Sequence, residues 1–165
     1  MPDAIDKLSA ELGAALKSRG WMVATAESCT GGGVGEAITR TAGSSAWFDR
    51  GFITYTNEAK QELLGVRAET LQTFGAVSEQ TALEMARGAL AASRAHLAVA
   101  LSGIAGPGGA APGKPVGMVC FAWVSKQGFE RIETCFFSGD RSEVRHQAIG
   151  VALRGIVSAT TPVAG

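Results

Sequence analysis

The strongest restriction on the fold of this chain comes from residues 97–101, Leu-Ala-Val-Ala-Leu, which are apolar at every position. Side chains along a β-strand point alternately to the two faces of its sheet. A strand that is apolar on both faces is therefore typical of the middle of a sheet that helices cover on both sides. The run predicts a central, buried strand, and it favours an α/β architecture.

Helical and strand patterns alternate along the rest of the chain. Apolar side chains recur with helical spacing near the N-terminus, and short apolar or β-branched runs bounded by glycines predict strands. We therefore expect a single three-layer α/β domain over residues 1–165, with a mixed β-sheet of about five strands and helices on both faces. The predicted strands are residues 22–26, 52–56, 97–101, 116–124 and 130–137. The predicted helices are residues 3–19, 34–40, 58–64 and 79–93, with Ser78 expected to cap the helix at 79–93 and Asp140 expected to cap a last helix.

The balance of charge excludes several classes of partner. The chain has 15 basic and 15 acidic residues, so it has no surplus of positive charge for nucleic acid or for an anionic membrane surface. No apolar run approaches the length of about 18 residues that a transmembrane helix requires. Residues 1–6 carry acidic side chains where a signal peptide needs basic ones. We expect a cytoplasmic protein with no nucleic-acid partner and no membrane partner.

The cysteines and histidines do not suggest a metal site. Cys29, Cys120 and Cys135 are odd in number and widely spaced, which fits reduced thiols and offers neither a disulfide framework nor a zinc site. The two histidines, His96 and His146, also lack the spacing of metal ligands. We expect neither a metal nor another cofactor.

Residues 43–60 hold the side chains that amide hydrolysis without a metal needs. A serine hydroxyl is a poor nucleophile until a base removes its proton, and a neutral lysine can serve where no histidine is placed to do so. The candidates are Ser45 as the nucleophile, Lys60 as the base and Tyr55 beside them. Ser44 competes with Ser45, since one residue of register decides which serine faces the lysine.

The local structure expected around Lys60 bears on its charge. Residues 52–56 are β-branched or aromatic and predict a strand, after which Asn57 is expected to cap a helix. Lys60 would then lie in the first turn of that helix, where the helix dipole and burial both disfavour the charged ammonium. Glu58 would oppose this effect if it lay close. The alternative is that Lys60 is a solvated helix lysine and Tyr55 a half-buried strand tyrosine.

A Gly-rich turn at residues 27–33 follows the first predicted strand and precedes a helix. Such a turn leaves bare backbone N–H groups at the positive end of a helix, where they can bind a phosphate or a carboxylate. The alternative is a tight strand-to-helix turn that needs glycine for packing. The candidate substrate-binding residues in this turn are Glu27, Ser28, Thr30, Gly31 and Gly32.

A second Gly-rich turn, at residues 102–109, follows the central strand. Its backbone N–H groups could stabilise the oxyanion of a tetrahedral intermediate, which makes Ser102 and Gly103 candidates, or the turn could be a flexible loop. Near the start of the last helix, Arg141 and Arg145 are four residues apart and share a helix face. They could grip a phosphate together, or they could form a solvated face.

Six separated blocks of the sequence resemble the CinA C-terminal domain family, and the resemblance covers nearly the whole chain. The blocks are Thr-Ala-Glu-Ser-Cys-Thr-Gly-Gly at 25–32, the stretch 43–60, Gly-Ala-Val-Ser-Glu at 75–79, Ser-Gly-Ile-Ala-Gly-Pro at 102–107, Lys-Pro-Val-Gly at 114–117 and Phe-Ser-Gly-Asp-Arg at 137–141.

The resemblance implies an activity. Stand-alone members of the family are nicotinamide-nucleotide amidohydrolases, which hydrolyse the carboxamide of nicotinamide mononucleotide (NMN) to nicotinate mononucleotide and ammonia in pyridine-nucleotide salvage. It also implies Ser45 as the nucleophile with Tyr55 and Lys60 as its partners, an oxyanion site at Ser102 and Gly103, and a homo-oligomer, with a dimer favoured. We expect the activities of the N-terminal domain found in longer members to be absent.

Two other functions stay open at this point. The first is a non-catalytic nucleotide-binding module, in which the Gly-rich turns hold a nucleotide and Lys60 stays charged against its phosphate. The second is an amidase for another small amide, which would share the catalytic residues and differ only in the pocket.

Overall fold

The computed structural model describes residues 3–161, and the remaining residues of the predicted domain, 1, 2 and 162–165, lie outside the described part. The strands are β1 (Val23–Glu27), β2 (Phe48–Ile53), β3 (Leu97–Gly103), β4 (Met118–Ser125) and β5 (Glu130–Phe136). The helices are α1 (Ala4–Arg19), α2 (Gly33–Ile38), α3 (Asn57–Leu64), α4 (Ala68–Phe74), α5 (Glu79–Ala91) and α6 (Arg141–Thr160), and a 3-10 helix, η1 (Ser44–Ala46), precedes β2.

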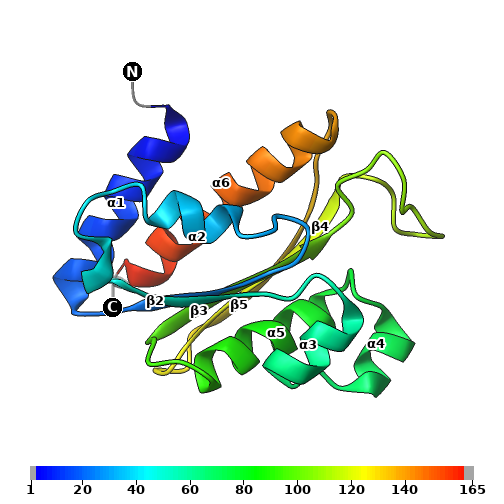
Figure 1. Ribbon diagram of the computed structural model, residues 1–165, viewed down its shortest axis with the longest axis horizontal. Coiled ribbons are helices and arrows are strands. Elements are labelled where there is room, and N and C mark those ends of the chain that lie inside the picture. Colours follow the sequence, from blue (N-terminus) through cyan, green and yellow to red (C-terminus); the bar gives the residue numbers. More distant parts are fainter. Residues whose placement is uncertain (1–2, 162–165) are drawn as a thin grey trace.

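The five strands form one mixed sheet in the order β2-β1-β3-β4-β5. Strand β1 pairs in parallel with both β2 and β3, whereas β4 is antiparallel to both β3 and β5. Helices α1, α2 and α6 cover one face of the sheet, and α3, α4 and α5 cover the other (Figure 1). The predicted three-layer α/β domain with a mixed five-stranded sheet is therefore confirmed.

The central strand β3 separates two hydrophobic cores. Its larger side chains, Leu97, Val99 and Leu101, belong to the core that the sheet shares with α1, α2 and α6. The small side chains of Ala98 and Ala100 belong to the core on the side of α5. Because alanine projects little from the sheet, it lets the Ala-rich helix α5 lie close to the strand. Residues 97–101 of β3 are all buried, which confirms the prediction made from their composition.

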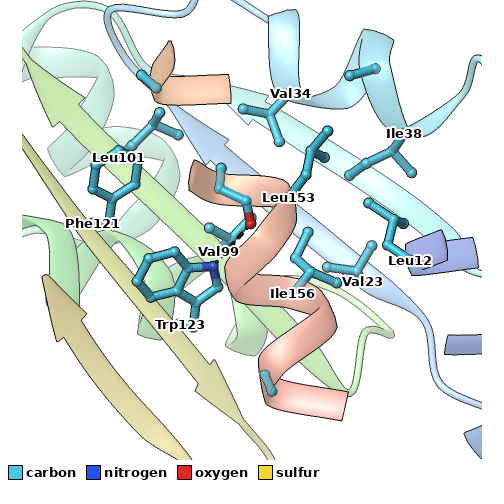
Figure 2. Close-up of a cluster of buried hydrophobic side chains, with 14 of the residues drawn as sticks. Leu12, Val23, Val34, Ile38, Val99, Leu101, Phe121, Trp123, Leu153 and Ile156 are labelled. Carbon is cyan, nitrogen blue, oxygen red and sulfur yellow. Dashed lines mark hydrogen bonds between the residues drawn. The ribbon is translucent and has the colours of Figure 1, made fainter. Parts of the chain in front are cut away.

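Helix α6 packs onto the larger core through Trp123 of β4 (Figure 2). The indole is fully buried, and its Nε1 atom donates a hydrogen bond of 3.1 Å to the carbonyl oxygen of Ala152. A buried tryptophan needs such a partner for its one polar group. Gly155 lies against the same ring and leaves no room for a Cβ atom.

The parallel strands decide where distant residues meet. Strands β1, β2 and β3 run in the same direction, so their C-terminal ends share one edge of the sheet. Ser28 follows β1 directly, Thr54 follows β2 directly, and Ser102 lies at the end of β3. In open α/β sheets, ligands bind outside the carboxyl ends of the strands. This edge is therefore the place to search for a site.

The strand predicted for residues 52–56 is wrong in its bounds, because β2 spans Phe48–Ile53. The last residue of β1, Glu27, pairs with Ile53, so the chain beyond Ile53 has no partner strand in β1. Strand propensity continues to Thr56, but pairing does not.

The predicted cap of the next helix is also wrong. Thr56, not Asn57, caps α3, since the Thr56 side chain accepts a hydrogen bond from the backbone N–H of Ala59. Asn57 is the first helical residue. A threonine caps a helix by the same hydrogen bond as an asparagine, and with Thr56 as its cap the helix begins one residue earlier than expected.

The other predicted caps are confirmed. Ser78 caps α5 through a hydrogen bond from Thr81 N, and Asp140 caps α6 in a reciprocal pair with Glu143. Each side chain satisfies a backbone N–H group that the helix itself leaves without a partner. Within residues 3–161, every helix is too short or too polar to span a lipid bilayer.

Candidate active site

A cavity of about 280 Å³ lies where the turns after β1 and β3 meet the N-terminal parts of α3 and α6. Six residues predicted from the sequence meet in this cavity: Ser28, Tyr55, Lys60, Ser102, Gly103 and Arg141. The other lining residues are Cys29, Ala76, Val77, Ile104, Ala105, Gly106, Gly108 and Gly109.

Lys60 is the buried lysine of this cavity, and it is only 1% exposed. Its Nζ atom lies 3.0 Å from Ser28 Oγ, 2.8 Å from the carbonyl oxygen of Thr54 and 3.4 Å from the carbonyl oxygen of Tyr55. No carboxylate among residues 3–161, that of Glu58 included, lies within ion-pair distance of this atom. The amine is therefore enclosed by neutral oxygen atoms.

This environment favours the neutral form of Lys60. Burial lowers the pKa of Lys60, because desolvation penalises the charged ammonium. A neutral amine has two N–H bonds and one lone pair. The carbonyl oxygens of Thr54 and Tyr55 can accept the two N–H bonds, which leaves the lone pair for the hydroxyl proton of Ser28. The arrangement has the geometry of a base beside a serine nucleophile.

Ser45 lies elsewhere in the fold. It belongs to η1, which comes just before β2, and it does not line the cavity. The first residues of β1 and β2 pair with each other, so Ser45 lies near the N-terminal ends of these strands. Lys60 lies near their C-terminal ends, and the length of β1 separates the two positions. That length is about 13 Å at roughly 3.3 Å per residue. The structure thus does not bring Ser45, or its neighbour Ser44, to Lys60, because the serines precede β2 and the lysine follows it.

The serine that does meet Lys60 is Ser28, which the sequence analysis assigned to substrate binding. Its position carried a signal for a nucleophile, because it directly follows a buried strand in a strand–turn–helix segment. Enzymes of the α/β-hydrolase fold carry their nucleophilic serine on a sharp strand-to-helix turn at the carboxyl end of the sheet. The backbone N–H of Ser28 donates a hydrogen bond of 3.2 Å to the carbonyl oxygen of Leu101, which ties the turn to the central strand.

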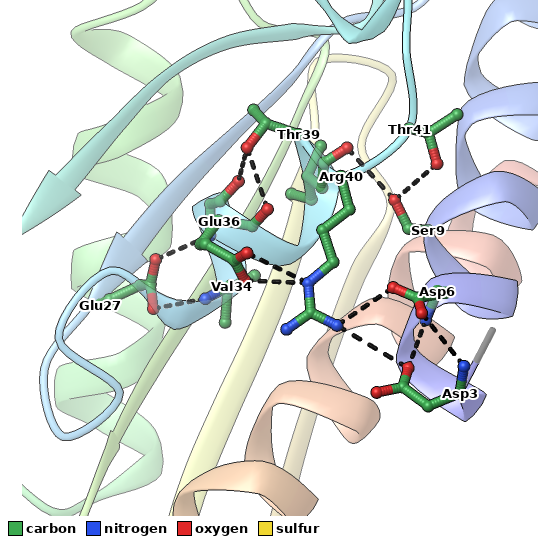
Figure 3. Close-up of polar contacts among 11 residues, drawn as sticks. Asp3, Asp6, Ser9, Glu27, Val34, Glu36, Thr39, Arg40 and Thr41 are labelled. Atoms are coloured by element: carbon green, nitrogen blue, oxygen red, sulfur yellow. Dashed lines mark hydrogen bonds and ion pairs between the residues drawn. The ribbon is translucent and has the colours of Figure 1, made fainter. Parts of the chain in front are cut away.

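The backbone N–H groups at the start of α2, directly after the first Gly-rich turn, already bind a carboxylate, that of Glu27 (Figure 3). Glu27 is buried and accepts hydrogen bonds from Val34 N at 2.9 Å, from Gly35 N at 3.0 Å and from Thr30 Oγ1 at 2.6 Å. Glu27 and Thr30 thus satisfy each other and the start of α2. The carboxylate occupies the positive end of the helix, where the sequence suggested that a substrate anion could bind.

Three further predicted site residues do not line the cavity: Gly31 and Gly32 belong to the turn, and Arg145 contacts it. Gly31 and Gly32 have positive φ angles of 58° and 103°, and they turn the chain from β1 into α2. Positive φ is the region that glycine adopts without steric cost, so these positions fit the packing interpretation. Arg145 donates hydrogen bonds to the carbonyl oxygens of Cys29 and Thr30.

Tyr55 and Arg141 meet at the exposed side of the cavity. Arg141 donates a hydrogen bond of 3.0 Å to the hydroxyl of Tyr55 and one of 2.9 Å to the carbonyl oxygen of Gly106. The Tyr55 side chain is 57% exposed, and it is the backbone carbonyl of this residue that contacts Lys60. Within the described part of the chain, no carboxylate pairs with Arg141. Its positive charge is therefore available to an anionic ligand.

The second Gly-rich turn supplies polar groups without partners. Ser102 is 1% exposed and lines the cavity, and its hydroxyl has no hydrogen-bonding partner among residues 3–161. The backbone N–H groups of Ala105 and Gly106 likewise meet no acceptor in the described structure. Unpaired donors at the wall of a cavity can stabilise a developing oxyanion.

Cys29 lies next to Ser28 in the cavity wall, and its thiol is not activated. Burial raises the pKa of the Cys29 thiol to about 11, so the thiol stays protonated near neutral pH. In the part of the chain that the structure describes, no three side chains of the His, Cys, Asp or Glu types are grouped as metal ligands.

The sequence matches the model of the CinA C-terminal domain over residues 5–160. The nicotinamide-nucleotide amidohydrolase PncC of Escherichia coli K12 is 57% identical over 148 residues, which is 90% of each chain. Its Pseudomonas putida counterpart is 48% identical over 161 residues, covering 96% of this chain and 99% of that protein. The crystal structure of the competence/damage inducible protein CihA from Agrobacterium tumefaciens, 48% identical in sequence, matches with a TM-score of 0.94 over 98% of both chains. The chain therefore belongs to the CinA C-terminal domain family.

Proposed function

We propose that this chain hydrolyses the carboxamide of NMN to nicotinate mononucleotide and ammonia, as a step of pyridine-nucleotide salvage. Ser28 is the nucleophile and Lys60 is the base. The observation that carries the proposal is the 3.0 Å contact between Lys60 Nζ and Ser28 Oγ inside a cavity. The choice of substrate rests on the relatives from E. coli and P. putida, which are named nicotinamide-nucleotide amidohydrolases.

The first half of the reaction forms an acyl-enzyme. Neutral Lys60 takes the hydroxyl proton of Ser28, and Ser28 Oγ attacks the carboxamide carbon. The carbonyl oxygen becomes an oxyanion, which the N–H groups of Ala105 and Gly106 are free to bind. When the intermediate collapses, the C–N bond breaks and the Lys60 ammonium returns its proton to the leaving nitrogen, so that ammonia departs.

The second half restores the enzyme. Lys60, neutral again, takes a proton from water, and the hydroxide oxygen attacks the ester carbonyl of the acyl-enzyme. The C–O bond to Ser28 then breaks, and Lys60 protonates the serine oxygen. The products are nicotinate mononucleotide and ammonia, with one water consumed.

The substrate's phosphate is assigned to Arg141. This guanidinium lines the cavity and has no carboxylate partner in the described structure, and arginine binds phosphate through paired N–H donors. The Ser102 hydroxyl, which lines the same cavity, is assigned to the carboxamide. These assignments make the cavity a site for a mononucleotide amide.

The test is ammonia release from NMN by the purified protein, with the organic product identified by mass spectrometry. Ser28→Ala is expected to lower kcat by about 1,000-fold or more, because it removes the nucleophile. Ser45→Ala is the matched control, since it makes the same change outside the cavity, and it should retain kcat within about twofold.

Three outcomes would contradict this proposal in different ways. Full activity of Ser28→Ala together with inactivity of Ser45→Ala would return the nucleophile to Ser45. Binding of NMN without ammonia release would favour the nucleotide-binding module. Faster turnover of another small amide than of NMN would leave the chemistry in place and reassign the substrate.

A further inference from the structure

The turn that carries Ser28 is held from two sides. On the inner side, the buried carboxylate of Glu27 accepts a hydrogen bond from Val34 N of α2 (Figure 3). It also accepts hydrogen bonds from Gly35 N and from Thr30 Oγ1. Within the turn, Gly31 N donates to the carbonyl oxygen of Ser28 and Gly33 N donates to that of Thr30, each at 3.0 Å. These contacts leave the carbonyl oxygen of Cys29, and the second lone pair of the Thr30 carbonyl oxygen, available to a donor from outside the turn.

Arg145 of α6 is that donor. Its Nε atom donates a hydrogen bond of 3.1 Å to the carbonyl oxygen of Cys29, and its Nη2 atom donates one of 3.2 Å to that of Thr30. The two contacts span 116 and 115 positions of sequence, so they join the turn to a distant helix. Among residues 3–161, no carboxylate forms an ion pair with Arg145. The guanidinium is therefore oriented by the turn itself.

Arg141, one helical turn earlier, is used differently. It lines the cavity and contacts Tyr55 and Gly106, whereas Arg145 does not line the cavity. Spacing alone suggested that the two arginines act together on a phosphate. In the structure, Arg141 lines the cavity, whereas Arg145 contacts the backbone of the turn that carries Ser28.

We propose that Arg145 is a positioning residue that holds the backbone at Cys29 and Thr30 so that Ser28 Oγ stays within reach of Lys60, and that it is not a phosphate ligand. The proposal rests on the proposed function, because it takes Ser28 as the nucleophile. The physical reason is the short distance that proton transfer requires. A misplacement of about 1 Å can reduce the rate of a chemical step by about 100-fold.

The first test separates kcat from KM. Arg145→Ala is expected to lower kcat by about 10-fold or more with little change in KM, and to do so equally for NMN and for nicotinamide riboside, which lacks the phosphate. Arg145→Lys keeps a charged donor that can reach one carbonyl, and it should recover part of the loss. Arg154→Ala, the same change at an exposed position of α6, is the matched control and should leave kcat unchanged. A rise in KM confined to NMN would make Arg145 a phosphate ligand and overturn the proposal.

The second test does not depend on turnover. Hydrogen–deuterium exchange of the Gly31 and Gly33 amides should accelerate by about 10-fold or more in Arg145→Ala, since loss of charge-assisted hydrogen bonds loosens the turn. The Arg154→Ala variant should exchange like the parent. Unchanged exchange in Arg145→Ala would overturn the proposal, as would faster exchange with kcat intact. If the parent released no ammonia from NMN, the proposed function would fail, while exchange would still decide whether Arg145 holds the turn.

Discussion

Lys60 Nζ lies 3.0 Å from Ser28 Oγ, although 32 positions of sequence separate the two residues. The contact forms because β1 and β2 are parallel and end at the same edge of the sheet, so that the turn after β1 faces the helix after β2. The two carbonyl oxygens near Lys60 belong to the segment between β2 and α3, which fixes the amine as it enters the helix. The fold thus places a buried amine against a serine in a cavity whose described lining holds no histidine and no carboxylic acid.

The pH dependence of the reaction should report the charge of Lys60. The value of kcat/KM is expected to rise with pH as Lys60 loses its proton, and the midpoint should lie below the ordinary lysine pKa of about 10.4, because burial lowers it. Lys60→Met and Lys60→Arg should each lower kcat by about 100-fold or more, since neither supplies a neutral amine. A Lys60→Arg variant with parental activity would exclude lysine as the base.

The stability of the fold should also depend on the protonation of Lys60. Its pKa is lower in the folded protein than in the unfolded chain, so between these two values the unfolded chain binds more protons. The free energy of unfolding should therefore rise with pH across this interval, toward about pH 10.4. Urea titrations of the parent and of Lys60→Met at several pH values measure the effect as the difference between their slopes.

A second buried group, Cys29, also affects how the free energy of unfolding depends on pH. Burial raises the pKa of this thiol to about 11, so the folded protein retains its proton longer and Cys29 contributes the opposite slope above about pH 8.5. Both proteins carry Cys29, and its contribution cancels in the comparison. Equal slopes for the parent and Lys60→Met would show that the amine is not shifted by burial.

Removal of the Arg141 guanidinium from the cavity should weaken binding of the phosphate. Arg141→Ala is expected to raise KM for NMN by about 10- to 100-fold, which corresponds to the loss of a charge-assisted hydrogen bond worth about 1.5–3 kcal/mol. Arg141→Lys should show a smaller rise, because lysine supplies the charge without the paired donors. Steady-state kinetics with nicotinamide riboside provide the comparison. An equal loss with both substrates would indicate that Arg141 acts on the Gly106 turn and not on phosphate.

The contact between α6 and β4 requires a residue without a side chain at position 155. A Cβ atom at Gly155 would overlap the Trp123 indole, so Gly155→Ala is expected to lower the free energy of unfolding by about 1–3 kcal/mol. Gly150→Ala is the matched control in the same helix, where the nearest atom to the new Cβ is Nη1 of the exposed Arg154, at 3.3 Å. That change should be neutral or stabilising by up to about 1 kcal/mol, because alanine favours a helix. Urea unfolding of both variants checks the order, and a Gly155→Ala protein as stable as Gly150→Ala would contradict it.

The features that sequence predicted well are those that neighbouring residues decide. The burial of β3 follows from its own composition, and the caps at Ser78 and Asp140 follow from side chains that bond to N–H groups three residues on. The five-stranded α/β sheet follows from such local patterns taken together. Self-association as a dimer stays a prediction, because the structure describes one chain.

Tertiary structure decided which side chains meet. Strand propensity could not end β2 at Ile53, because that limit is set by the end of β1. Ser45 is nearer to Lys60 in the sequence than Ser28 is. However, β2 runs between Ser45 and Lys60, so the two residues lie at opposite ends of this strand. A β-strand separates its two ends by a fixed rise per residue, whereas parallel pairing brings the ends of different strands together. Proximity in the site is therefore a property of the sheet's topology, and only the folded chain contains it.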